Sequence, residues 1–328
     1  MDPNSPYLSI VLPVFNEEDG LSAMMKELYS VCNSLNKSYE IIFVDDSSSD
    51  RTPEILGQFT SQDPRIKVLR FSRNFGHQAA LSAGIDVAEG QFVVTMDSDL
   101  QHPPRVVLEF IKEAEKGFDV VIGERLSNKQ NSFVREAIGK TYYKFLSSVT
   151  DLEFKNVSDF VLYKKSVIEV IKRLPEKERF LRGIVQWVGF KKKYVPYTVE
   201  ARQHGKSHYS LRRLFFSFFM NGITSFSAFP LRLAFGAGIL VLMVSLIFSG
   251  YVVWDHYVNP NPLNQGNTTI ILLILFLGSF QMIVLGIFGE YFYKMFNEVK
   301  GRPAYIVAQT KNLDEDEIEK TSYGIYNF

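Results

Sequence analysis

Two carboxylates, Asp97 and Asp99, stand one residue apart directly after a short apolar run. The run, Phe92–Met96, is typical of a strand buried on both faces, which places the two carboxylates at a strand end. Hard divalent cations such as Mg²⁺ or Mn²⁺ bind a few carboxylate oxygens together with the phosphate oxygens of a substrate. We therefore predict a divalent-cation site at Asp97 and Asp99, to which Gln101 could add a further oxygen. The alternative is an ordinary solvated loop.

A second acidic pair, Asp45 and Asp46, follows the apolar run Glu40–Val44. Carboxylates at such a strand end could accept hydrogen bonds from a ribose or from the edge of a base. The alternative is a plain helix start at this point, with Asp50 as its N-cap residue. The two interpretations are compatible, because a cap and a ligand contact use different residues.

These pairs must be positioned by the alternating pattern of the first half of the chain. Apolar runs of strand length alternate with stretches whose apolar residues recur at helical spacing, and this order predicts a mostly parallel α/β sheet covered by helices. Ligands of such sheets bind beyond the carboxyl ends of the strands. The predicted strands are Leu8–Leu12, Glu40–Val44, Ile66–Phe71 and Phe92–Met96, and the predicted helices are Leu21–Leu35, Thr52–Phe59 and His77–Ala88.

Composition restricts the classes of protein that the chain can represent. The 328 residues include 36 basic and 36 acidic side chains, and this balance argues against a nucleic-acid partner. Cys32 is the only cysteine, so no disulfide can form within the chain, which is compatible with a reducing compartment. No signal peptide is visible at the N-terminus.

The second half of the chain changes character near Ser210. Between Leu211 and Phe229, large apolar residues recur at steps of three and four, while Arg212 and Arg213 lie off that stripe. This pattern favours a helix lying in a membrane interface, in contact with membrane lipids. The alternative is an ordinary core helix.

Two long uncharged runs follow this stripe. Leu233–Trp254 and Thr268–Gly289 contain no Asp, Glu, Lys or Arg, and each exceeds the roughly 20 apolar residues needed to cross a bilayer. The loop between them, Asp255–Asn267, has no Lys or Arg, whereas basic residues lie before the first run and after the second. The positive-inside rule therefore predicts an integral membrane protein with the first domain and both termini in the cytoplasm.

Four segments together resemble the family 2 glycosyltransferases. They are Val11–Glu18 (VLPVFNEE), Val44–Asp50 (VDDSSSD), Arg73–Gln78 (RNFGHQ) and Met96–Pro104 (MDSDLQHPP). Within that family the chain is most similar to the polyprenyl-phosphate branch, which includes the bactoprenol glucosyltransferases and the dolichol-phosphate mannose synthases. The resemblance implies an α/β fold of the GT-A type, a Rossmann-like and mostly parallel sheet, and an inverting reaction.

The same resemblance implies the organisation of the whole chain. We expect a GT-A catalytic domain over residues 1–209, an amphipathic interfacial helix over 210–230, a two-helix transmembrane region over 231–293 and a cytoplasmic tail over 294–328. We assign no chemistry to the tail. The spans could pack between subunits, so a homo-oligomer is a further expectation.

The resemblance also assigns roles to individual residues. Nucleotide-binding residues would be Pro13, Phe15, Asn16, Glu17, Asp46 and Asp97. The metal, Mg²⁺ or Mn²⁺, would be held by Asp97, Asp99 and Gln101. Asp159 in the segment FKNVSDF matches an acidic position near the acceptor, so the expected catalytic residues are Asp97, Asp99 and Asp159. Phosphate or acceptor contacts would come from Arg125, Arg135, Arg202 and Lys206, the last two in a basic loop that could close over phosphates.

The implied reaction transfers a hexose from a nucleotide sugar to polyprenyl (undecaprenyl) phosphate, with glucose from UDP-glucose as the favoured donor. GDP-mannose, UDP-amino-arabinose and UDP-N-acetylhexosamine stay open as donors. A phosphate monoester has a second pKa near 6, so the acceptor is largely a dianion at neutral pH and needs no general base. We therefore predict that Asp159 positions the acceptor or the sugar.

Three other classes of protein fit less well. A non-catalytic scaffold that binds lipid or sugar nucleotide would be expected to have lost the paired aspartates or the basic loop. A processive polysaccharide synthase usually carries a Gln-x-x-Arg-Trp motif, whereas here Gln186 directly precedes Trp187. A dehydrogenase needs a glycine-rich turn after the first strand, where this chain has Pro13–Glu17.

Overall fold

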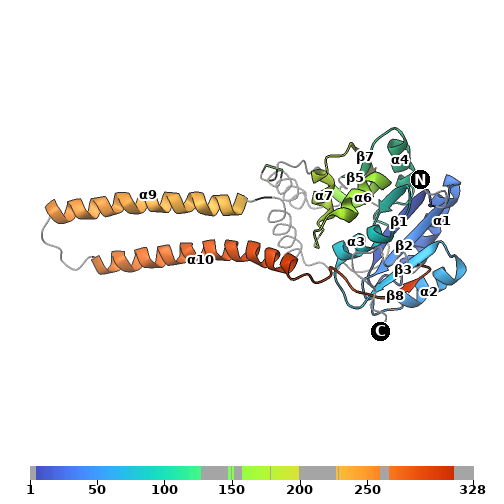
Figure 1. The fold of residues 1–328 in the computed structure, drawn as a ribbon, viewed down its shortest axis with the longest axis horizontal. Coiled ribbons are helices and arrows are strands. Elements are labelled where there is room, and N and C mark those ends of the chain that lie inside the picture. The colour runs from blue at the N-terminus through green and yellow to red at the C-terminus, as the bar shows by residue number, and fades with distance from the viewer. Residues whose placement is uncertain are drawn as a thin grey trace. The chain divides into compact units, whose positions relative to one another are not determined.

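The computed structural model describes residues 5–126, 147–148, 150, 157–177, 179–198, 227, 229–258 and 266–313. The chain divides into two compact units (Figure 1). The first, here called the α/β unit, comprises Met1–Leu211 and Pro303–Phe328, and the second, here called the helical unit, comprises Arg212–Arg302.

One mixed sheet of eight strands forms the centre of the α/β unit, in the order β7-β5-β6-β4-β1-β2-β3-β8. Four neighbouring strands, β4, β1, β2 and β3, run parallel, β6 is antiparallel to both β4 and β5, and β8 is antiparallel to β3. The predicted mostly parallel sheet is confirmed. The strands are β1 (Leu8–Val14), β2 (Tyr39–Asp45), β3 (Ile66–Phe71), β4 (Phe92–Thr95), β5 (Val120–Leu126), β6 (Val157–Lys164), β7 (Lys192–Thr198) and β8 (Val307–Lys311).

Helices cover both faces of this sheet (Figure 1). Helices α1 and α4 pack against one face, in a cluster that contains the fully buried Leu8, Ile10 and Leu12 of β1. These three side chains share a face because successive residues of a strand point to opposite sides. Helix α3 packs against the other face so closely that a Cβ on Gly84 would collide with Val11. The helices in the described residues of this unit are α1 (Leu21–Leu35), α2 (Thr52–Gln62), α3 (His77–Val87), α4 (Val106–Glu115), α6 (Lys165–Arg173) and α7 (Leu181–Trp187).

The expected bounds of the first four strands and the first three helices agree with the observed ones to within three residues at each end. One expectation at this level is wrong. The N-cap position of α2 is Arg51, although Asp50 Oδ1 still accepts a hydrogen bond from the Thr52 amide at 3.0 Å. Asp50 thus accepts a hydrogen bond from the start of the helix, although it lies one residue before the N-cap position.

The carboxyl ends of β1, β2 and β4 lie along one edge of the sheet, because these strands are parallel neighbours. Strand β6 runs the opposite way, and its pairing with β4 ends at Thr95 opposite Val161. Asp97 and Asp159 each lie two residues beyond that last pair. The sheet therefore brings residues that are distant in sequence to a single edge.

In the helical unit, the residues that the structure describes form two long helices, α9 (Phe229–Val258) and α10 (Gly266–Val299). Both contain segments long and apolar enough to cross a membrane, Phe229–Phe248 and Phe276–Val299, and neither segment is buried within the structure. Large apolar side chains such as Leu240, Ile247 and Phe288 are exposed on them. The two predicted spans thus correspond to two helices that could span a membrane. The expected interfacial helix at 210–230 lies almost entirely outside the described residues.

Candidate functional site

The paired aspartates occupy a turn in which exposure alternates from residue to residue. Asp97, Asp99 and Gln101 are partly exposed, whereas the residues between them are buried. Leu100 has a φ of 63°, a left-handed conformation that is uncommon for a leucine. All three residues predicted to hold a cation are therefore partly accessible to solvent.

Two buried side chains, Ser98 and His102, hold this turn in place. The Ser98 hydroxyl donates a hydrogen bond to the Pro13 carbonyl at 3.1 Å, which ties the turn to the end of β1. His102 Nδ1 accepts a hydrogen bond from the Asp97 amide at 2.9 Å, and its ring stacks on Phe160 with centroids 4.9 Å apart. Since Nδ1 accepts this bond, the ring carries its proton on Nε2 when it is neutral.

The loops that follow β1 and β2 are joined by reciprocal hydrogen bonds. The Asn16 amide donates to Ser48 Oγ at 2.9 Å, and the Ser49 amide donates to Asn16 Oδ1 at 2.8 Å. Asn16 and Ser47 both have positive φ values, 55° and 64°. The predicted nucleotide-binding residues Pro13, Phe15, Asn16 and Glu17 lie in this joined region, and Phe15 is 37% exposed.

Asp46, at the end of β2, is buried and shapes the loop before α3. Its two carboxylate oxygens accept hydrogen bonds from the amides of Phe75 and Gly76, at 2.6 and 2.9 Å. Burial raises the pKa of Asp46, and these two hydrogen bonds oppose that effect. A direct contact between Asp46 and a nucleotide stays a prediction.

Asp159 is a buried carboxylate held by a cation. Arg182 donates from Nε to Oδ1 at 2.8 Å and from Nη2 to Oδ2 at 2.6 Å. Burial alone would raise the pKa of Asp159, but the charge of Arg182 and the hydrogen bonds from His77 and Arg182 hold that pKa well below its usual range. Asp159 is therefore ionised at neutral pH and is a weak proton acceptor.

His77 lies between the two acidic positions at the start of α3. Its Nε2 is 3.2 Å from Asp159 Oδ2 and 3.5 Å from Asp97 Oδ1. Desolvation opposes a charge on this ring, but the hydrogen bond to Asp159 and the charges of Asp97 and Asp159 raise the pKa of His77 above its usual value. A protonated His77 ring offsets the negative charge of Asp97 and Asp159.

Of the four basic residues predicted to contact phosphates, the structure describes one, Arg125. Arg125 is exposed near the end of β5 and pairs in register with Tyr197 of β7. Because β5 is antiparallel to β6, the end of β5 lies at the same edge as Asp159. Arg135, Arg202 and Lys206 lie outside the described residues.

The donor set at the turn fits a cation that is shared with a substrate. Among the described residues, no group of three or more His, Cys, Asp and Glu side chains is arranged to hold a metal ion. Two partly exposed carboxylates on one turn, Asp97 and Asp99, match instead the way in which Mg²⁺ binds, through one or two carboxylates plus substrate phosphates.

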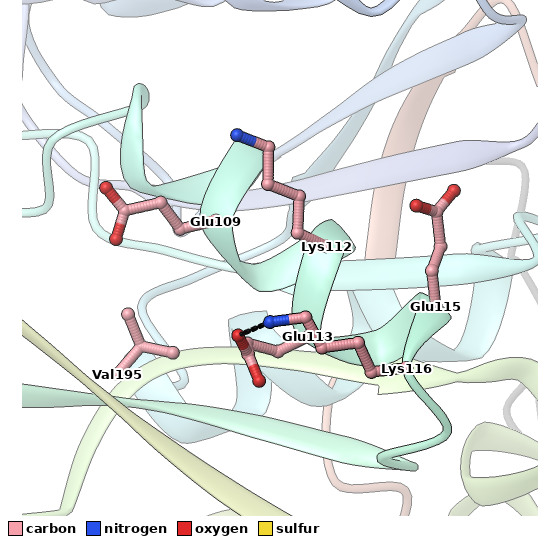
Figure 2. Close-up of a pocket in the computed structure, with 6 residues that line it drawn as sticks. All are labelled: Glu109, Lys112, Glu113, Glu115, Lys116 and Val195. Atoms are coloured by element: carbon pink, nitrogen blue, oxygen red, sulfur yellow. Dashed lines mark hydrogen bonds and ion pairs between the residues drawn. The ribbon is translucent and has the colours of Figure 1, made fainter.

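A hollow of about 480 Å³ lies along α4, away from these residues (Figure 2). Glu113 and Lys116 form an ion pair of 2.6 Å at its rim. Glu115, which also lines it, accepts a hydrogen bond from Tyr7, near the amino end of β1 and so at the opposite edge of the sheet. No predicted site residue lines this hollow, and we assign it no function. Its lining residues are Glu109, Lys112, Glu113, Glu115, Lys116 and Val195.

The sequence motifs did not assign a role in the site to three residues: His77, Gln78 and Arg182. His77 and Gln78 belong to a segment that was quoted only for its resemblance. Arg182 interrupts the otherwise apolar stretch Phe180–Val185, and a charge in such a stretch is the signal that could have identified it.

Comparisons with known proteins identify relatives of the whole chain. Residues 9–171 match glycosyl transferase family 2. The uncharacterized glycosyltransferase YkcC of Bacillus subtilis is 36% identical over 316 residues, which cover 96% of this chain and 97% of that protein. The SfII prophage-derived bactoprenol glucosyl transferase of Shigella flexneri is 35% identical over 304 residues, which cover 92% of this chain and 98% of that protein.

A further relative is the prophage bactoprenol glucosyl transferase homolog of Escherichia coli K12, 34% identical over 305 residues, which cover 93% of this chain and 99% of that protein. Among solved structures, glucosyl-3-phosphoglycerate synthase of Mycobacterium tuberculosis with Mn²⁺, UDP-glucose and phosphoglyceric acid aligns with a TM-score of 0.49 at 18% identity. That alignment covers 66% of this chain and 79% of the other.

Proposed function

The chain belongs to glycosyl transferase family 2 and is a glycosyltransferase, and from this premise we propose that it transfers glucose from UDP-glucose to undecaprenyl phosphate. The observation that carries the proposal is the extent of the similarity to the bactoprenol glucosyl transferase of Shigella flexneri. It covers 92% of this chain, so it includes the apolar helices as well as the α/β unit.

The reaction forms one bond and breaks one. An oxygen of the acceptor phosphate attacks the anomeric carbon, the bond from that carbon to the donor diphosphate breaks, and UDP leaves with the electron pair. The configuration at the anomeric carbon is inverted. No proton has to be removed, because the acceptor phosphate is largely a dianion at neutral pH.

Asp97, Asp99 and Gln101 would hold a divalent cation, Mg²⁺ or Mn²⁺, whose chemistry here is to offset the negative charge that develops on the leaving diphosphate. The loops around Pro13–Glu17 and Asp46 support the nucleotide. Asp159 positions the acceptor or the sugar as a fixed anion, and its low pKa supports this role over that of a base.

The lipid acceptor is consistent with the two apolar helices, α9 and α10. With no Lys or Arg in Asp255–Asn267, the positive-inside rule places that connection outside the cytoplasm and the α/β unit inside. The sugar phosphate lipid is then made at the cytoplasmic face. Assembly as a homo-oligomer stays a prediction.

The test is transfer of radiolabel from a panel of UDP- and GDP-sugars to undecaprenyl phosphate in detergent. We expect lipid-linked product from UDP-glucose, lost on chelation and restored by Mg²⁺ or Mn²⁺. Asp99→Ala should abolish transfer, whereas Glu169→Ala, which removes an exposed carboxylate on α6, should leave it unchanged. If lipid-linked product forms only from another donor, that donor's sugar replaces glucose in the proposal. If no donor gives a lipid-linked product, the proposed acceptor is wrong.

A further inference from the structure

The carboxylate of Asp159 is held from three directions. Arg182 contacts both of its oxygens, at 2.8 and 2.6 Å. His77 lies 3.2 Å from Oδ2, and Gln78 Nε2 donates a hydrogen bond to Oδ1 at 3.4 Å. Since two oxygens receive contacts from one planar guanidinium, both the place and the rotation of the carboxylate are set.

Arg182 is itself placed by helix α3. The amide of the preceding residue, Leu181, donates a hydrogen bond to Gln78 Oε1 at 3.3 Å. Three residues earlier than Arg182, Arg179 donates to Asp86 Oδ1 at 2.6 Å in an ion pair that is buried on both sides. Both Gln78 and Asp86 belong to α3, so this helix anchors the segment that carries Arg182 at two points.

We propose that Arg182 is a positioning residue, which fixes the Asp159 carboxylate in the orientation that the transfer reaction requires. This inference rests on the proposed function, in which Asp159 positions a reacting group. Two parallel N–H···O bonds define an orientation that the single ammonium of a lysine cannot reproduce. The charge of Arg182 alone is therefore insufficient, and its fork geometry matters.

A second arginine–aspartate pair with the same two-bond geometry lies away from the candidate site and provides a matched control. Arg65 donates from Nε and Nη2 to the two oxygens of Asp63, both at 2.9 Å. This pair lies before β3, at the amino end of a parallel strand, and the Arg65 side chain is 52% exposed. Arg65→Lys and Arg182→Lys thus make the same chemical change in two places.

The experiment measures steady-state release of nucleoside diphosphate from whichever donor of the panel the wild-type protein cleaves. This readout reports cleavage of the donor whatever nucleophile attacks, so it stays informative if the proposed lipid acceptor is wrong. We expect Arg182→Lys to lower kcat by about 10²-fold, the scale of a misplaced reacting group, while KM for the donor changes less than about twofold. Arg65→Lys should match the wild type.

A double-variant cycle separates positioning from a structural role. If Arg182 acts through Asp159, then Arg182→Lys should have no further effect on kcat in an Asp159→Asn background. Wild-type kcat in Arg182→Lys would overturn the inference. So would the same loss of kcat in both backgrounds, or a loss of kcat in Arg65→Lys equal to that in Arg182→Lys. Thermal unfolding of each variant shows whether a loss of kcat accompanies loss of the fold.

Discussion

The Tyr305 hydroxyl donates a hydrogen bond of 3.0 Å to Asp86 Oδ2, which joins the segment after α10 to helix α3. Asp86 also pairs with Arg179, and all three residues are buried. Tyr305 stacks on Phe71 as well, with ring centroids 5.2 Å apart. The segment after α10 is thus an integral part of the α/β unit.

Tyr305→Phe should lower the free energy of unfolding by about 1.5–3 kcal/mol, because a buried carboxylate loses one hydrogen bond. Tyr29→Phe is the matched control, since Tyr29 donates at 3.2 Å to Asp63, which pairs with the exposed Arg65. Asp63 still accepts three hydrogen bonds from Arg65 after this change, so the effect should be smaller. Denaturant unfolding of both variants checks this, and equal losses would contradict the account.

Gly76→Ala should destabilise the protein by about 1–3 kcal/mol through backbone strain. Gly76 precedes α3 with φ 97° and ψ 161°, a region that residues with a Cβ rarely adopt, although a Cβ there would meet no atom within 4 Å. Because α3 begins with His77 and Gln78, kcat should fall as well. Denaturant unfolding and steady-state kinetics of the variant measure the two effects.

The control for this change is Gly20→Ala at the start of α1. Gly20 has a helical conformation, with φ −95° and ψ −26°, and a Cβ would make only ordinary contacts, the nearest at 3.8 Å. We expect a change within about 0.5 kcal/mol. Equal destabilisation by the two substitutions would show that the conformation of Gly76 is not the cause.

The ionised state of Asp159 predicts how stability depends on pH. Its pKa is depressed in the folded protein, so its contribution to stability is complete above the ordinary aspartate pKa of about 4. The contribution is lost as the pH falls through the lower folded-state pKa. The difference in unfolding free energy between proteins with Asp159 and with Asn at this position should therefore stay constant from about pH 7 to pH 5 and narrow below about pH 4.

This comparison is made in a His77→Gln background, because His77 Nε2 lies 3.2 Å from Asp159 Oδ2 and any change in its charge would alter the interaction being measured. Arg182 still holds the carboxylate in that background. Urea unfolding at a series of pH values gives the two free energies. A difference that already narrows near neutral pH would contradict a depressed pKa.

The sequence was sufficient to predict the central sheet and the acidic strand ends, because both depend on local patterns. Continuous apolar runs identified β1 to β4, and the paired aspartates follow such a run. Strand β8 could not be predicted in this way. Its sequence, VAQTK, is short and mostly polar, and it becomes a strand only by pairing with β3, more than 200 residues away in the chain.

The same limit applies to the site. Asp159 was found through a motif, but its partner Arg182 belongs to a different element, and their ion pair depends on how α7 packs near β6. Tyr305 and Asp86 are likewise joined only by the fold. Contacts between residues far apart in sequence produce no local pattern of residue types, so a single sequence does not predict them.

The central claim is tested most directly by mass spectrometry of the lipid after reaction of the full-length protein with UDP-glucose, undecaprenyl phosphate and Mg²⁺ or Mn²⁺. The account predicts that undecaprenyl phosphate gains the mass of one hexose, and that Asp99→Ala yields no such lipid. Unmodified undecaprenyl phosphate, with UDP-glucose either intact or hydrolysed to free glucose, would contradict it.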